Sequence, residues 1–282
     1  MSAIASVDLW GQLFNFSDYD QLIPLVQNSL IAGALLGLVG GLIGLFVMTR
    51  DMSFAVHGIS ELSFAGASFA LLAGIDVVAG SIAGSLVAAL IIGALGSRAK
   101  DRNSIIAVLM PAGLGLGILA LSIYEGRAAN KFGLLTGQII AVDAPQLYSL
   151  FGICAFILVA LAVVWRPLMF ASLDPEVAAA RGVPTRTLSV VFMLLLGLAV
   201  AASVQVVGAL LVLSLLVTPA AAALRVTRSP ILTPILSVAF ALTAVIGGIL
   251  LALGGGLPIS PYVTTISFLI YVVCRLIERL RK

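Results

Sequence analysis

The chain has 282 residues, of which 61% are hydrophobic and only 10% are charged, with a formal net charge of +3. Because a soluble globular protein carries about 25% charged residues, this composition excludes a soluble domain and predicts a polytopic membrane protein. The small positive charge is better explained by basic loops on one membrane face than by affinity for nucleic acid.

The first 22 residues differ in composition from the rest of the chain. They contain three aspartates but no lysine or arginine. A cleaved secretory signal begins with a basic region, so we expect no such signal here. Residues 1–22 are instead predicted to form an extracytoplasmic or interfacial segment, and residues 23–282 a single transmembrane domain.

Nine apolar segments follow, most of them close to the length of about 20 residues that spans a bilayer. They cover roughly residues 24–48, 54–74, 77–97, 104–123, 146–165, 187–202, 204–224, 231–253 and 259–277. The sixth is short, and Ser203-Val-Gln205 separates it from the seventh. These two segments could therefore be broken or re-entrant, so we expect an all-α bundle of eight or nine transmembrane helices.

The basic residues predict the orientation of this bundle. If the N-terminus lies outside and nine segments alternate, 13 of the 15 lysines and arginines fall in inner loops. Only Arg127 and Lys131 then fall outside. Inner loops of membrane proteins carry an excess of lysine and arginine, so an outer N-terminus and a cytoplasmic C-terminus are predicted.

The second apolar segment contains the only histidine of the chain, His57, and an acid, Glu61. Their four-residue spacing places both side chains on one face of a helix. Ionisable groups at membrane depth are costly and usually face the bundle interior or an aqueous path. An imidazole with a carboxylate can bind a metal or relay a proton. The structural alternative is a hydrogen bond that merely ties helices together.

Four uncharged polar residues are candidates for lining a pathway beside this pair. They are Ser60, Ser63, Gln138 and Gln205. Serines within helices more commonly bond back to their own backbone, and buried amides more commonly bond between helices. Both readings stay open for these residues.

The predicted inner loop over residues 166–186 contains a short helix with clear boundaries. Asp174 is a good N-cap, Pro175 suits the first helical position, and Glu176 suits the positive end of the helix dipole. Gly182 is typical of a helix end. A capped helix of about two turns in this loop could dock a cytoplasmic partner or could be a surface turn alone.

Three stretches resemble motifs of the bacterial ABC-type permeases for zinc, manganese and iron. They are Met52–Gly66, Leu134–Val142 and, most specifically, Leu173–Ala222, which includes Asp174-Pro-Glu176, Arg181-Gly-Val-Pro184, Gln205-Val-Val-Gly208 and Leu213-Ser-Leu-Leu-Val-Thr-Pro219-Ala. The resemblance extends from about residue 25 to the end of the chain. It implies an ABC importer permease in the bacterial inner membrane, with residues 23–282 as the permease domain.

The same resemblance implies the partners of the chain. A homodimer would form the channel, and an extracytoplasmic metal-binding protein would deliver the ion. Cytoplasmic ATPase subunits would use the ATP and dock on the helix near residues 174–182. The coupling residues would be Asp174, Pro175, Glu176, Arg181 and Gly182. No permanently bound cofactor is expected, since the divalent metal is the cargo.

One departure from the family pattern concerns the cargo. His57 stands where the family has aspartate, and Glu61 stands where it has histidine. The residue types are exchanged while the four-residue spacing is kept, which favours retained metal binding. Two His and two Glu from a dimer could hold Zn²⁺ as a tetrahedron, or Mn²⁺ with added water, at about mid-membrane.

Absent motifs narrow the function further. No glycine-rich GxxxxGK[ST] phosphate loop occurs, so the chain is not itself the ATPase. An intramembrane metalloenzyme remains an alternative, although it would need more ligands than His57 and Glu61. A secondary carrier would leave the capped cytoplasmic helix unexplained. A permease for a metal chelate, such as cobalamin or a siderophore, would need a wide path without an ionic pair.

Overall fold

The computed structural model describes residues 23–95, 99–126, 142–253 and 259–281. The predicted N-terminal segment and Gln138 lie outside these residues. So does nearly all of the Leu134–Val142 stretch.

Eight helices of the described chain are long and apolar enough to cross a membrane. They are α3 (Gln27–Thr49), α4 (Ser53–Ala73), α5 (Val77–Leu95), α6 (Ala99–Ile123), α8 (Ala144–Leu173), α10 (Thr185–Val207), α13 (Leu232–Leu253) and α14 (Ile259–Leu280). Short helical elements lie before or between them: η1 (Ile23–Val26), α9 (Pro175–Ala180), η3 (Ala209–Leu211), α11 (Val212–Leu216) and α12 (Thr218–Val226). The expected all-α membrane bundle is confirmed, with eight long spans.

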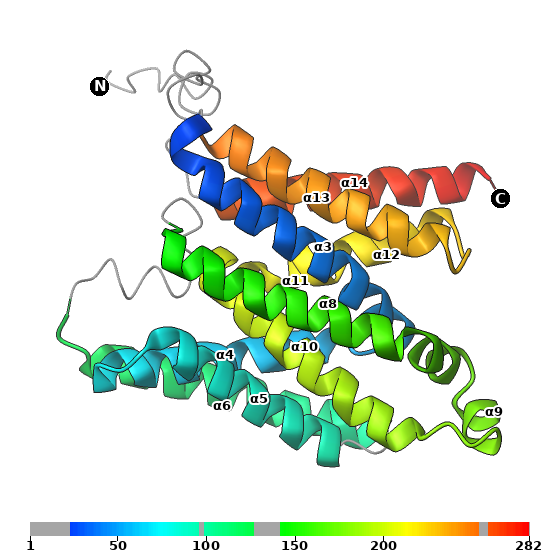
Figure 1. The fold of residues 1–282 in the computed structure, drawn as a ribbon, viewed down its shortest axis with the longest axis horizontal. Coiled ribbons are helices and arrows are strands. Elements are labelled where there is room, and N and C mark those ends of the chain that lie inside the picture. The colour runs from blue at the N-terminus through cyan, green and yellow to red at the C-terminus, as the bar shows by residue number, and fades with distance from the viewer. Residues whose placement is uncertain (1–22, 96–98, 127–141, 254–258, 282) are drawn as a thin grey trace, which may run out of the picture.

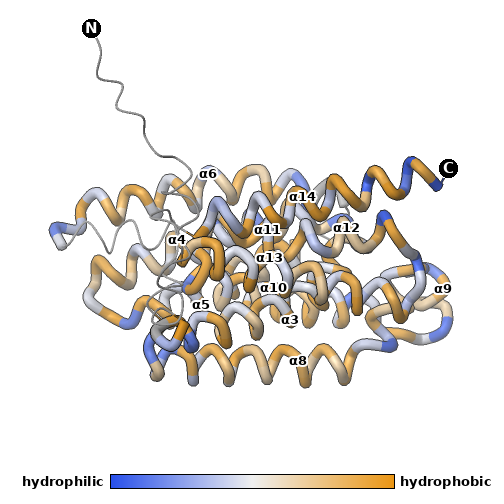
Figure 2. Tube along the Cα trace, turned by 90° about the horizontal axis from the view of Figure 1, so that it is seen from above, coloured by the Kyte–Doolittle hydropathy of each residue, from blue (hydrophilic) through white to orange (hydrophobic). Residues whose placement is uncertain are grey.

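The long helices run alongside one another (Figure 1). In Figure 1, α13 and α14 form one edge, α5 and α6 the other, and α3, α8 and α10 lie between them. Seen from above in Figure 2, α6, α4, α11 and α14 lie along one side of the bundle and α8 lies along the opposite side. The short α11 therefore belongs to the same layer as α4 and α14.

An aromatic cluster holds the centre of the bundle together. Phe46 of α3 is fully buried, and its ring centroid lies 4.9 Å from that of Trp165 in α8 and 5.9 Å from that of Phe192 in α10. Such tilted and edge-to-face pairs add to the stabilisation that comes from burial. The cluster thus holds α3 against α8 and α10, the two helices on either side of α9 in the chain.

The break in the seventh apolar segment lies later than expected. Helix α10 continues through Ser203 and Gln205 to Val207, so the predicted boundary between the sixth and seventh segments at Ser203-Val-Gln205 is wrong. The alternative of a broken segment that leaves eight full spans is confirmed for the described part of the chain. The hydroxyl of Ser203 donates to the carbonyl oxygen of Ala199, which is compatible with a continuous helix. The chain breaks instead at Gly208, where φ is 82°, a value that glycine adopts without strain. Beyond it, the seventh segment consists only of the short elements η3, α11 and α12.

Helix α8 is longer than the sequence indicated. It extends to Leu173 and contains Pro167, so the first part of the loop predicted over residues 166–186 is helical. A proline is tolerated in such a helix when neighbouring groups satisfy the carbonyl that it frees. As a result, α9 follows α8 after Asp174 alone.

Basic side chains gather at one end of the bundle. Arg102 donates from Nη2 to the carbonyl oxygen of Arg50 at 3.2 Å. Burial, together with the positive charge of Arg102, lowers the pKa of Arg50. At the same end, Arg225 of α12 lines a pocket with Thr49 and lies 3.5 Å from Glu278. We call this the basic end, defined by Arg50, Arg102, Arg225, Arg228, Arg275 and Arg281.

Candidate functional site

His57 and Glu61 lie on adjacent turns of α4 in the half nearer the basic end. The helix begins at Ser53, directly after the turn that contains Arg50. At 1.5 Å per residue, His57 lies about 6 Å and Glu61 about 12 Å along this helix. Glu61 is therefore near the middle of the span, and His57 is one turn closer to the basic end.

The two side chains face each other without forming a hydrogen bond. Nε2 of His57 lies 3.7 Å from Oε1 of Glu61, beyond hydrogen-bond distance. Both residues belong to α4, so this contact does not tie two helices together. The imidazole side chain is 29% exposed and the carboxylate only 6%. The pair is thus open on the imidazole side and enclosed around the carboxylate.

Both residues retain buried polar atoms that have no partner among the described residues. These atoms are Nδ1 of His57 and Oε2 of Glu61. Leaving buried polar groups unpaired costs free energy, so such a group in a native structure calls for an explanation. Imidazole nitrogen and carboxylate oxygen are both metal ligands, so each of these atoms is able to accept a cation as its partner.

Two residues do not complete a metal site. No group of three or more His, Cys, Asp or Glu side chains that could hold a metal occurs in the part of the chain that the structure describes. The remaining ligands would therefore come from water or from a second copy of the chain. This arrangement suits an ion in passage better than a tightly held structural ion.

The two serines beside the pair have partners within the helix bundle. The hydroxyl of Ser60 donates to the carbonyl oxygen of His57 at 2.8 Å. The hydroxyl of Ser63 bonds to Ser81 of α5, with 2.8 Å between the two hydroxyl oxygens. Both serines are fully buried. This geometry favours a packing role, and lining of a pathway stays a prediction for them.

A row of polar residues on α14 was not singled out from the sequence. We call Ser260, Thr264, Ser267 and Tyr271 the polar stripe of α14. Successive spacings of four, three and four residues place them on one helix face. In the sequence, only this regular spacing within an apolar run indicates the polar stripe, because each of these residues alone is common in membrane helices.

Helix α11 joins the polar stripe of α14 to the layer that contains α4. Ser214 of α11 donates from its hydroxyl to Thr264 at 3.3 Å, and its carbonyl oxygen accepts from Ser267 at 3.3 Å. Helix α11 also contacts α4. The helices that carry the His57–Glu61 pair and the polar stripe, α4 and α14, therefore lie on the same side of the bundle with α11 between them (Figure 2).

The predicted capped helix is present at the basic end as α9 (Figure 1). Oδ1 of Asp174 accepts from the backbone N–H of Val177 at 3.0 Å, which is the N-cap bond. Glu176 lies in the first turn, Arg181 is the C-cap and Gly182 has a φ of 82°. The capping residues thus take the positions expected from the sequence, and Glu176 is exposed.

A model of the ABC 3 transport family matches residues 22–278. The chain belongs to this family. It is the membrane-embedded permease subunit of an ABC transport system, and not the ATPase. The resemblance drawn from the sequence motifs is thereby confirmed.

Two relatives of this permease are named as manganese transport proteins. The chain is 33% identical over 236 residues to the manganese transport system membrane protein MntC of Halalkalibacterium halodurans, covering 82% of this chain and 80% of that protein. It is 29% identical over 209 residues to the manganese import system permease protein ScaB of Streptococcus parasanguinis, covering 74% of each.

Solved structures share the fold of the permease. PsaBC from Streptococcus pneumoniae, solved in complex with Fab, matches with a TM-score of 0.82 and 25% identity over 94% of this chain and 100% of that chain. An inward-facing conformation of a putative metal-chelate type ABC transporter matches with a TM-score of 0.70 and 18% identity, covering 94% and 92%. The second likeness concerns the fold alone.

One predicted pathway residue of the permease keeps an unused donor. Gln205 lies in the last turn of α10, just before the break at Gly208, and its Nε2 is buried without a partner among the described residues. Among the described residues, no hydrogen bond or ion pair joins Gln205 to the His57–Glu61 pair. A pathway role for Gln205 therefore stays a prediction, as it does for Gln138, which lies outside the described residues.

Proposed function

We propose that two copies of this permease form the path by which an ATP-driven importer moves a divalent transition-metal ion, with Mn²⁺ as the cargo. The observation that carries this proposal is the His57–Glu61 pair, in which a buried nitrogen and a buried oxygen atom have no partner among the described residues. The names of the relatives favour manganese over the zinc that the ligand types would also accept.

In this mechanism, the pair replaces part of the water shell of the ion. Nitrogen from His57 and oxygen from Glu61 suit Mn²⁺, which accepts such ligands together with water. Two copies would supply two imidazoles and two carboxylates. A transported ion must be bound weakly enough to leave again. A site with few protein ligands and no thiolate meets this requirement, and the two cysteines lie elsewhere, on α8 and α14.

We further propose that the basic end of the permease is cytoplasmic and that α9 receives the ATPase subunit. The positive-inside rule supports this orientation, because basic side chains gather at that end. The exposed, capped α9 lies there as well. An extracytoplasmic metal-binding protein would then deliver the ion to the opposite end.

Uptake of labelled metal ions tests the cargo. Cells that lack their own manganese and zinc importers should take up Mn²⁺ in a saturable manner when they express the permease with its ATPase. Zn²⁺ and Fe²⁺ should compete only at much higher concentration. An ATPase variant that cannot hydrolyse ATP is the matched control and should abolish uptake. Saturable uptake of Zn²⁺ in preference to Mn²⁺ would overturn the manganese assignment.

Cross-linking tests the orientation and the docking of the ATPase together. In Glu176→Cys, the exposed thiol on α9 should cross-link to a cysteine on the cytoplasmic ATPase subunit. In Asp76→Cys, at the exposed turn between α4 and α5, the thiol should not. The two native cysteines are buried and should not interfere. A cross-link from position 76 rather than 176 would reverse the proposed orientation.

A further inference from the structure

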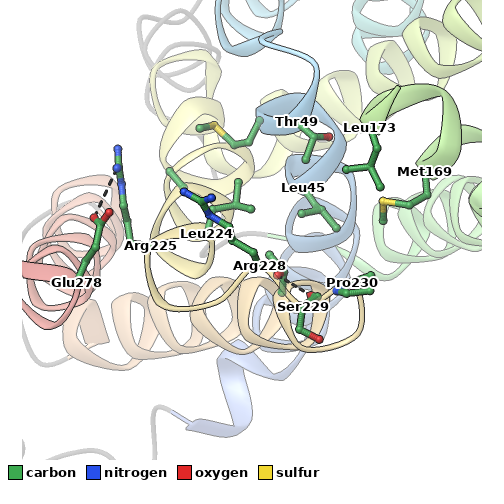
Figure 3. Close-up of a pocket in the computed structure, with 13 residues that line it drawn as sticks. Leu45, Thr49, Met169, Leu173, Leu224, Arg225, Arg228, Ser229, Pro230 and Glu278 are labelled. Carbon is green, nitrogen blue, oxygen red and sulfur yellow. Dashed lines mark hydrogen bonds and ion pairs between the residues drawn. The ribbon is translucent and has the colours of Figure 1, made fainter. Parts of the chain in front are cut away.

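A cavity of about 460 Å³ opens at the basic end between helices that are distant in sequence (Figure 3). Its volume falls within the range of pockets that hold small ligands, about 300–1,000 Å³. Its apolar wall comes from α3, α8 and α12. The apolar lining consists of Leu45, Met48, Met169, Leu173, Ala221 and Leu224. Nothing in the proposed transport path uses this cavity.

The rim of the cavity carries an excess of positive charge. Arg225 and Arg228 both line it, and Glu278 lies 3.5 Å from Arg225. The same carboxylate lies 2.8 Å from Arg275, so it faces two guanidinium groups at once. Arg228 forms no ion pair or hydrogen bond with any described residue. Two arginines and one carboxylate line the cavity, which leaves its rim positive.

The cavity joins this charged rim to apolar side chains near the ends of two membrane-spanning helices, α3 and α8. Leu45 and Met48 belong to the membrane-spanning part of α3, whereas Arg228 lies just beyond the end of α12. Figure 3 shows Leu45, Met169 and Leu173 on one side of the cavity and the arginines on the other. Leu173 is 70% exposed, so the apolar wall continues onto the outer surface of the bundle.

We propose that this cavity binds an anionic phospholipid of the surrounding membrane. Its phosphate lies against Arg228 and Arg225, and the upper part of an acyl chain lies along Leu45, Met169 and Leu173. Basic pockets between helices on the cytoplasmic side are suited to anionic headgroups. A segment of a cytosolic protein would reach the rim but would not need an apolar wall inside the span. The inference rests on the multi-pass membrane placement and on the proposed cytoplasmic position of the basic end, and it is independent of the metal cargo.

Native mass spectrometry of the purified full-length permease with its ATPase tests the proposal. Phosphatidylglycerol should bind saturably, and phosphatidylcholine should bind far more weakly. Removing one charge-assisted contact in Arg228→Gln should weaken phosphatidylglycerol binding at least about tenfold. Arg228 is exposed, so this variant should fold normally. The matched control is Arg186→Gln, which removes an exposed arginine near the start of α10, outside the cavity, and should leave binding unchanged.

Three results would overturn the proposal. Equal binding of the two lipids would exclude recognition of negative charge. Equal weakening in Arg228→Gln and Arg186→Gln would show general attraction to a basic surface. Unchanged lipid binding in Arg228→Gln with loss of the ATPase from the complex would assign the cavity to the protein partner. None of these readouts depends on metal uptake, so the proposed function can fail without the lipid site failing.

Discussion

Glu61→Ala should abolish metal uptake while the permease still folds and assembles. Loss of groups that only support a metal ligand typically costs about 10–100-fold in affinity or activity, so loss of a direct ligand should cost at least that much. The measurement is saturable Mn²⁺ uptake at matched amounts of permease in the membrane. His57→Ala should behave in the same way, because the two side chains face each other across 3.7 Å.

Two controls separate metal binding from folding in this experiment. Glu61→Gln keeps the size of the side chain but removes its charge, so it should also lose uptake. Ser68 lies two helical turns beyond Glu61 on the same face of α4. Ser68→Ala removes a buried hydroxyl that donates to the carbonyl oxygen of Phe64. It should retain uptake. Normal uptake by a well-folded Glu61→Ala permease would exclude the pair as the metal site.

Gly44→Ala should destabilise the whole bundle. A Cβ atom at this position would overlap the carbonyl oxygen of Leu216 and meet the Cβ of Ala220 at 3.2 Å. The overlapping atom belongs to the backbone of α11, so it cannot rotate away as a flexible side chain can. Overpacking of a close-packed core typically costs about 1–3 kcal/mol. We expect a lower melting temperature and a lower yield of monodisperse protein in size-exclusion chromatography.

Gly115→Ala is the matched control for this substitution. Gly115 lies in α6, and a Cβ atom there meets nothing within 4 Å. Alanine has a higher helix propensity than glycine, by about 1 kcal/mol. This variant should therefore melt at the same temperature as the wild type or slightly higher. Equal melting of Gly44→Ala and Gly115→Ala would show that α3 and α11 are not packed as the structure places them.

Local patterns predicted the parts of the fold that depend on neighbouring residues. Long apolar runs indicated the spans, because each membrane helix must satisfy its own backbone. Asp174 and Gly182 indicated both ends of α9, because caps depend on residues within one turn. The four-residue spacing placed His57 and Glu61 on one face of α4 for the same reason.

The errors arose where a local pattern was compatible with more than one structure. Ser203 and Gln205 suggested a helix break, yet a serine can bond to its own helix and leave it intact, as it does here. Gly208 was the break, but many of the glycines in this chain lie within unbroken helices. The conformation of the backbone, rather than the residue type alone, distinguishes these cases.

Composition, residue spacing and contacts within one or two helical turns were enough to indicate an all-α membrane protein with a capped helix at one end and an ionisable pair in α4. Its role as a permease came from the resemblance of three stretches to family motifs. The packing of the helices was needed to show that α11 connects the polar stripe of α14 to the layer of α4. It also decided that Leu45, Met169 and Arg228 share one cavity. The reason is physical: which helices become neighbours depends on the packing of the whole bundle, and no local pattern contains that information.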